Sequence, residues 1–155
     1  NEAIEKAQAD YDAKFDFGDD SIEKERGNIK PMTELAVEAL EPYGVPEFPE
    51  DGSQHRVSMT AKGEGWSIEF MGYIDFKFPD HGLIVDLKTT MRMPSVMAIG
   101  HQRQRAFYQK ANGNMTVKFL YVTPKKVDMK SVVPVDPDSF YWNGDEAVRL
   151  ELFGV

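Results

Sequence analysis

The chain has 155 residues, 41% hydrophobic and 28% charged, a balance that fits one globular domain with a buried core. It contains no cysteine, which excludes disulfide bonds, cysteine nucleophiles, thiolate zinc sites and cysteine-ligated iron–sulfur clusters. The formal net charge of −8 is unusual for a protein that binds nucleic acid, although clustered carboxylates are what a hard divalent cation requires.

The first part of the chain is predicted to be helical. Over residues 2–16, four apolar residues recur near one helix face: Ile4, Ala7, Tyr11 and Phe15. Ser21 is a candidate cap for a second helix to about Leu40, which Pro31 must restart or kink because an interior proline lacks a backbone donor. Residues 41–54 are predicted to be a loop because they carry three prolines and two glycines.

Strand patterns follow this loop. Val57 and Met59 alternate with polar residues, and from Trp66 to Phe76 most large apolar residues take even positions, which leaves Tyr73 and Asp75 on the other face. Residues 78–82 form a predicted turn. The next strand, residues 83–88, places Asp86 and Lys88 on one face.

The last third of the chain is predicted to start with a helix from Pro94 to Asn112, which Gly113 stops. Two strands are expected over residues 115–122 and 127–133, and residues 145–153 form a segment of uncertain type. We therefore expect one α/β domain over residues 1–155, with a central mixed sheet flanked by helices. Its helical part would span residues 1–41 and its core about 55–133.

The predicted hairpin brings two carboxylates together. If its turn is centred between Asp80 and His81, residues whose numbers sum to 161 face each other, so Asp75 lies opposite Asp86 on the same face. Two opposed like charges are destabilising, and a divalent cation between them is the simplest compensation. Lys88 projects to the same face. Two carboxylates and a lysine suffice for metal-assisted phosphodiester hydrolysis, whereas the plain alternative is an exposed Asp–Lys pair at a strand end.

The order of three motifs adds a family resemblance. Gly72-Tyr73-Ile74-Asp75, then Val85-Asp86-Leu87-Lys88-Thr89-Thr90, then Gln104-Arg105-Ala106-Phe107-Tyr108 resembles the PD-(D/E)XK nuclease superfamily. The similarity is to the RecB-type branch, which includes phage exonucleases, CRISPR-adaptation nucleases and mitochondrial genome-maintenance exonucleases. It covers about residues 66–123 and implies a restriction-endonuclease-like core.

The resemblance also implies roles for individual residues. Asp75, Asp86 and the backbone carbonyl of Leu87 would bind Mg²⁺ or Mn²⁺, and Lys88 would be the catalytic lysine. Gln104 and Tyr108 share a helix face and would reach the site or the DNA backbone. The further DNA-contacting residues would be His101, Arg103 and Arg105.

The sequence departs from the RecB-type pattern in two places. An upstream helix commonly supplies a histidine or glutamate to the metal, but residues 27–34 contain no histidine. Glu34 is the best substitute for this ligand, and Glu38 is the alternative. The sequence fits equally well with Glu34 being an ordinary exposed glutamate of a helix. Some relatives carry four cysteines around an iron–sulfur cluster, and without cysteine this chain is expected to have no such cluster.

The sequence thus predicts a metal-dependent deoxyribonuclease. An exonuclease of phage origin, or one of DNA replication, recombination or repair, is favoured by the type of relative. The alternatives are a catalytically inactive DNA-binding or regulatory module with the same fold, and an endonuclease. DNA is the expected partner, and the oligomeric state is left open. No stretch approaches the roughly 18 apolar residues of a membrane span and no signal-peptide pattern is recognisable, so a cytoplasmic protein is expected.

Overall fold

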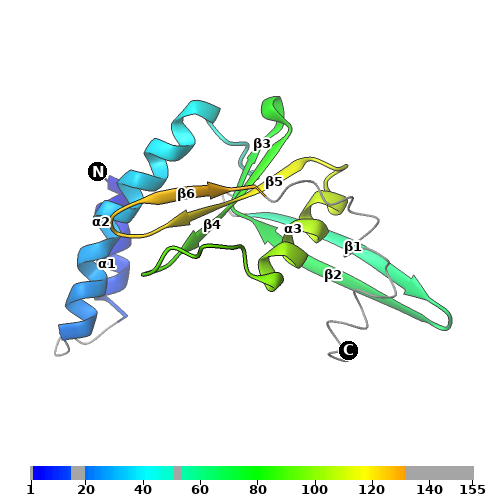
Figure 1. Cartoon of the computed structure of the whole chain (residues 1–155), viewed down its shortest axis with the longest axis horizontal. Helices are drawn as coiled ribbons and strands as arrows, with labels where there is room; N and C mark the ends of the chain where they lie inside the picture. The colour runs from blue at the N-terminus through cyan, green and yellow to red at the C-terminus, as the bar shows by residue number, and fades with distance from the viewer. Residues whose placement is uncertain (1, 15–19, 51–53, 132–155) are drawn as a thin grey trace. The chain divides into compact units, whose positions relative to one another are not determined.

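The computed structural model describes residues 2–14, 20–50 and 54–131, and the predicted segment 145–153 lies outside them (Figure 1). The chain divides into two compact units, which are described separately. Unit 1 comprises Asn1–Gly44, Leu87–Met93 and Leu120–Met129, and unit 2 comprises Val45–Asp86, Pro94–Phe119 and Lys130–Val155. In the described part of the chain, no helix is both long and apolar enough to cross a bilayer.

Unit 1 begins with two helices that lie side by side, α1 (Glu2–Asp12) and α2 (Asp20–Leu40) (Figure 1). The guanidinium of Arg26 donates two hydrogen bonds to the Asp12 carboxylate, from Nε to Oδ1 and from Nη2 to Oδ2, the second at 2.8 Å. This hydrogen bonding keeps the pKa of Asp12 below its usual range. The ion pair therefore links the two helices most strongly where Asp12 is charged, and the link weakens as acid protonates Asp12.

Helix α2 is one element despite Pro31 in its interior, so of the two predicted effects of this proline the restart does not occur and the kink stays a prediction. Proline removes one backbone donor, and its ring is directed at the carbonyl four residues earlier, which belongs to Gly27. Just beyond the proline, the Thr33 hydroxyl donates to the carbonyl of Ile29 at 2.7 Å. The helix is followed by a 3-10 turn, Glu41–Tyr43.

Unit 2 contains a two-stranded antiparallel ribbon of β1 (His55–Gly63) and β2 (Trp66–Ile74), paired from His55↔Ile74 to Gly63↔Trp66. The predicted alternation is confirmed, because even positions of β2 are at least half-buried and odd positions are exposed up to Tyr73. Helix α3 (Ile99–Ala111) contacts this ribbon. The ribbon thus has one covered face and one exposed face.

A second sheet holds the predicted hairpin. β3 (Phe76–Phe78) and β4 (Leu83–Thr89) pair antiparallel as Phe76↔Val85, Lys77↔Ile84 and Phe78↔Leu83, so the predicted register sum of 161 is confirmed. The turn between them is the 3-10 segment Pro79–His81, closed by Gly82 in the left-handed region at φ 55°. The prediction of one continuous strand from Trp66 to Phe76 is wrong, because the chain bends at Asp75 and changes partner strand.

The order of strands in this sheet is β3-β4-β5-β6, with β5 (Thr116–Val122) and β6 (Val127–Lys130). Backbone bonds from Thr116 to the Gly82 carbonyl and from Thr90 to the Val122 carbonyl run in the same chain direction, so β4 and β5 are parallel. All side chains of β4 from Leu83 to Asp86 are buried, as is typical of a central strand. The protein is therefore a mixed α/β fold.

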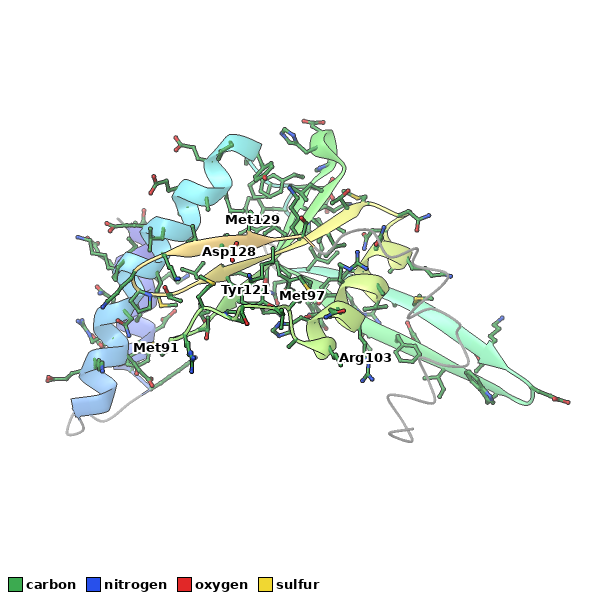
Figure 2. The ribbon with its side chains drawn as sticks, viewed as in Figure 1. Met91, Met97, Arg103, Tyr121, Asp128 and Met129 are labelled. Carbon is green, nitrogen blue, oxygen red and sulfur yellow. The ribbon has the colours of Figure 1, made fainter. Side chains whose placement is uncertain are left out.

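Helix α3 begins at Ile99, five residues after the predicted start at Pro94. The intervening segment buries Met97, and the Gln102 side chain donates to the Met97 carbonyl at 2.9 Å, so this stretch is a non-helical lead-in to α3 (Figure 2). The predicted stop is confirmed, since the helix ends at Ala111 and Gly113 adopts φ 63°.

Candidate active site

The centre of the candidate site is the carboxylate of Asp86, in the middle of β4. Its residue is only 2% exposed, and a buried carboxylate is costly unless it is hydrogen-bonded or coordinates a cation. Gln104 on α3 supplies one such bond, from Nε2 to Asp86 Oδ2 at 3.4 Å. Strand β4 and helix α3 therefore meet at this carboxylate within unit 2.

Gln104 and Tyr108 act together because they are four residues apart on α3 and share a helix face. The Gln104 Nε2 atom donates to the Tyr108 hydroxyl at 2.9 Å, and this hydroxyl donates to the backbone carbonyl of Tyr73 at 2.5 Å. A continuous chain of hydrogen bonds thus runs from Asp86 through α3 to the backbone of β2.

The charges of Asp75 and Asp86 both affect the pKa of Tyr108, which belongs to this chain of hydrogen bonds. Burial has the largest effect and raises the pKa of Tyr108 above its ordinary value, and the charges of Asp86 and Asp75 raise it further, while the hydrogen bonds with Gln104 and with the Tyr73 carbonyl lower it. The hydrogen bond from Gln104 is the second largest of these effects, yet the pKa is raised overall. Asp75 and Asp86 are therefore both near one phenolic hydroxyl.

Asp75 occupies the bend between β2 and β3 and is half-buried. Phe76 pairs with Val85, so the next step in the same register brings Asp75 toward Asp86. The Gln54 side-chain amide donates to Asp75 Oδ1. Carboxylate oxygens such as these are the ligands that Mg²⁺ and Mn²⁺ prefer, so the donor atoms of the pair fit such an ion.

Gln54 was not predicted as a site residue. It ends the predicted loop of residues 41–54, in which Glu47 contacts β3. Glu47 forms a bridge with Lys77, its backbone amide donating to the Lys77 carbonyl at 2.8 Å and its carboxylate binding the Lys77 ammonium at 2.9 Å. No local sequence signal reports such a contact across 30 residues.

Gly72 lets helix α3 approach β2 closely. A Cβ atom at this position would lie 2.8 Å from ring carbons of both Phe107 and Tyr108, closer than real contacts allow. The glycine of the predicted Gly-x-x-Asp motif therefore has a steric function here: it admits the two rings that bring Gln104 and Tyr108 toward the carboxylates.

The other predicted metal-site residues lie in unit 1. Leu87 and Lys88 continue β4 beyond Asp86, and both are half-buried. Glu34 is exposed on α2 with its carboxylate 3.9 Å from the Lys30 ammonium, and Glu38 is also exposed. Among the residues that the structure describes, no three His, Asp or Glu side chains form a metal-binding group. Glu34 as a third ligand stays a prediction.

The predicted DNA-contacting residues on α3 differ in exposure. His101 stacks on the ring of Phe119 with 5.5 Å between centroids, and Arg103 is half-buried. Arg105 is only 5% exposed. Figure 2 labels Arg103 on α3. Of the two arginines, Arg103 is thus the one with appreciable surface for a phosphate contact.

The raised pKa of Tyr108 leads to a spectroscopic prediction. In a titration of phenolate absorbance, Tyr108→Phe should remove one step that lies above pH 10.0, the ordinary value for tyrosine, because burial and two carboxylates oppose ionisation. Tyr43→Phe is a control for the loss of one tyrosine. A missing step at or below the ordinary value in Tyr108→Phe would contradict the position of this hydroxyl beside Asp75 and Asp86.

The contact of Gln54 with Asp75 leads to a second prediction. Gln54→Ala should raise the Mn²⁺ concentration needed for half-maximal binding by about tenfold, because groups that orient a metal ligand typically contribute that much. Isothermal titration calorimetry with Mn²⁺ measures this change. Gln102→Ala is the matched control, since the Gln102 amide bonds a backbone carbonyl and no carboxylate. Equal Mn²⁺ affinities in all three proteins would contradict a positioning function of Gln54.

Comparisons with known proteins give a fold but no family. No protein-family model matches the sequence, and no curated protein matches it. The chain is similar in structure to SSO0001, known from its crystal structure, with a TM-score of 0.57. The match covers 99% of this chain and 86% of that chain at 13% sequence identity. A likeness at this identity supports a shared α/β fold and carries no conclusion about activity.

Proposed function

We propose that this protein is a metal-dependent nuclease that hydrolyses phosphodiester bonds in DNA. The observation that carries the proposal is the hairpin register, which brings Asp75 toward the buried Asp86, together with the charges of both carboxylates acting on the hydroxyl of Tyr108. A buried carboxylate and a second one beside it are unfavourable without a cation, which gives the pair a reason to bind one. The ion would be Mg²⁺ or Mn²⁺, as the oxygen donors favour.

Each residue of the candidate site would have its own role in phosphodiester hydrolysis. Asp75 and Asp86 would hold the ion, and a bound ion would supply an activated water and neutralise charge on the phosphate. Gln54 and Gln104 fix the two carboxylates through their amides. On the resemblance to RecB-type nucleases, the Leu87 carbonyl would be a further ligand, and Lys88 would orient the water or stabilise the developing charge. Tyr108 fixes Gln104 by its hydrogen bond.

The finer fold assignment belongs to the same proposal. A hairpin with an aspartate on each side, then a helix with Gln104 and Tyr108, then a strand parallel to β4 agree with a restriction-endonuclease-like core. Exonuclease activity is favoured by the resemblance to RecB-type enzymes, and an origin in phage or in DNA replication, recombination or repair is proposed on the same basis.

The test is cleavage of three labelled DNA substrates in Mn²⁺: a single strand, a linear duplex and a covalently closed circle. The proposal expects cleavage of a linear substrate in Mn²⁺ and none in a chelator. Release of nucleotides from the ends, with the circle intact, identifies an exonuclease. Cleavage of the circle identifies an endonuclease instead. Full activity in the chelator would refute the metal-dependent reaction.

A second candidate is a DNA-binding module that does not cleave. One observation favours it: the described residues offer two clustered carboxylates and no group of three metal-binding side chains. Protein-bound ions of this kind usually have more ligands, although Mg²⁺ keeps several waters. Binding of the linear duplex without cleavage in Mg²⁺, Mn²⁺ or Co²⁺ would establish this alternative.

A further inference from the structure

The exposed side of the β1–β2 ribbon has the composition of a surface that binds single-stranded nucleic acid. We name it the outer ribbon face. Its eight residues are all exposed, and they pair across the ribbon as Arg56↔Tyr73, Ser58↔Met71, Thr60↔Glu69 and Lys62↔Ser67. The opposite face is the one that Phe107 and Tyr108 of α3 approach.

Two large apolar side chains stand on the outer ribbon face. Tyr73 is 51% exposed and Met71 54% exposed, so a large part of each side chain is open to solvent. They are two positions apart on one strand, about 7 Å along it. An exposed ring on a flat strand can stack an unpaired base of any type, a contact that a base inside a duplex cannot make.

Cations accompany these apolar groups although the whole chain carries a net charge of −8. Arg56 lies directly across the ribbon from Tyr73, and Lys62 lies further toward the tip. These two cations compare with a single carboxylate on this face, that of Glu69. The Arg56–Glu69 pair is 3.8 Å apart with both side chains 55% exposed, so it is worth little and a phosphate can replace the carboxylate. Aromatic, cationic and small hydroxyl side chains together suit a polyanion with exposed bases.

The outer ribbon face ends near the candidate active site along the chain. The backbone carbonyl of Tyr73 accepts the hydrogen bond of Tyr108, and Asp75 follows two residues later, at the bend that ends β2. A strand of DNA with one base on Tyr73 would thus pass near the carboxylates.

We propose that the outer ribbon face binds single-stranded DNA next to the scissile phosphate, with Tyr73 stacking a base and Arg56 pairing with a phosphate. This inference rests on the proposed nuclease function and specifies its substrate: an unpaired strand, read without sequence preference. The ring of Tyr73 and the guanidinium of Arg56 would make different contacts. Loss of the ring should lower affinity for the single strand, and loss of the guanidinium should also lower the salt dependence of binding.

The test is fluorescence anisotropy of a labelled 20-nucleotide oligodeoxythymidine, and of a duplex of equal length, in EDTA to prevent cleavage. Tyr73→Ala should raise the dissociation constant for the single strand at least fivefold, while Tyr73→Phe, which keeps the ring, stays within twofold of wild type. Arg56→Ala should weaken binding and reduce its salt dependence by about one phosphate contact. Phe48→Ala is the matched control, since Phe48 is 59% exposed but lies outside the ribbon.

Each result decides between named outcomes. Wild-type affinity of Tyr73→Ala for the single strand, or binding of duplex alone, overturns the inference. Self-association of the wild type also overturns the inference if sedimentation velocity shows that Tyr73→Ala abolishes it. The outer ribbon face would then bind a second copy of this chain. Failure of the nuclease proposal is seen separately: wild type would not cleave in Mn²⁺ even if binding depends on Tyr73. Cleavage by wild type with Tyr73-independent binding refutes the outer ribbon face alone.

Discussion

Asp86→Asn is expected to lower the rate of DNA cleavage by on the order of a thousandfold, because it removes a charged metal ligand from a water-poor site. The asparagine has the same shape and keeps an oxygen for the Gln104 amide, so the fold should persist. In the absence of metal its melting temperature should be equal to or above that of wild type, since the like charges of Asp75 and Asp86 no longer repel. Initial cleavage rates in Mn²⁺ and thermal unfolding in a chelator measure both effects.

Two companion variants make this prediction specific. Asp80→Asn removes an exposed carboxylate from the turn of the same hairpin and should leave the rate unchanged. Lys88→Met should reduce the rate strongly without weakening Mn²⁺ binding, because an ammonium is not a metal ligand and repels the cation. Retention of wild-type activity by Asp86→Asn would remove the basis of the nuclease proposal.

Gly72→Ala is expected to destabilise the protein by about 1–3 kcal/mol, the usual cost of overpacking, and to lower the melting temperature by about 3–10 °C. The new methyl group would lie 2.8 Å from ring carbons of Phe107 and of the buried Tyr108, and two rings on one helix cannot both turn away. Helix α3 must then move off β2, which draws Gln104 away from Asp86 and lowers activity as well. Differential scanning calorimetry and cleavage rates on the same samples measure the two effects.

The control for Gly72 is a glycine with free space around it. A Cβ atom at Gly27, inside helix α2, would have no neighbour within 4 Å. Gly27→Ala should therefore stabilise the protein by about 0.5–1 kcal/mol through helix propensity alone. If Gly72→Ala proves as stable as wild type, the close approach of α3 to β2 is wrong.

Much of the hairpin was predictable because its determinants are local. A turn centred between Asp80 and His81 sets which residues of β3 and β4 oppose each other, and the structure has that register. The spacing of Gln104 and Tyr108 likewise sets their shared helix face, and they are hydrogen-bonded to each other. Register and helix periodicity depend only on counting residues.

Three features were not predictable by counting. The bend at Asp75 is invisible because the apolar alternation continues across it, while the choice of partner strand depends on the whole fold. The start of α3 was predicted too early because proline suits a first helical turn, but the lead-in is not helical and buries Met97 instead. Gln54 donates to Asp75, which lies 21 residues away in the sequence, so no local pattern reports this contact.

The β1–β2 ribbon turns at its far tip through Glu64 and Gly65, where Gly65 has φ 79°. Insertions at this tip would leave the pairs near its base unchanged if they came in twos, one residue for each strand. A single inserted residue would instead require a bulge, since pairing within the ribbon has a period of two. Related proteins that share this ribbon should therefore vary in its length by even numbers. The ribbon could therefore lengthen in steps of two residues during evolution while the bend at Asp75 stays unchanged.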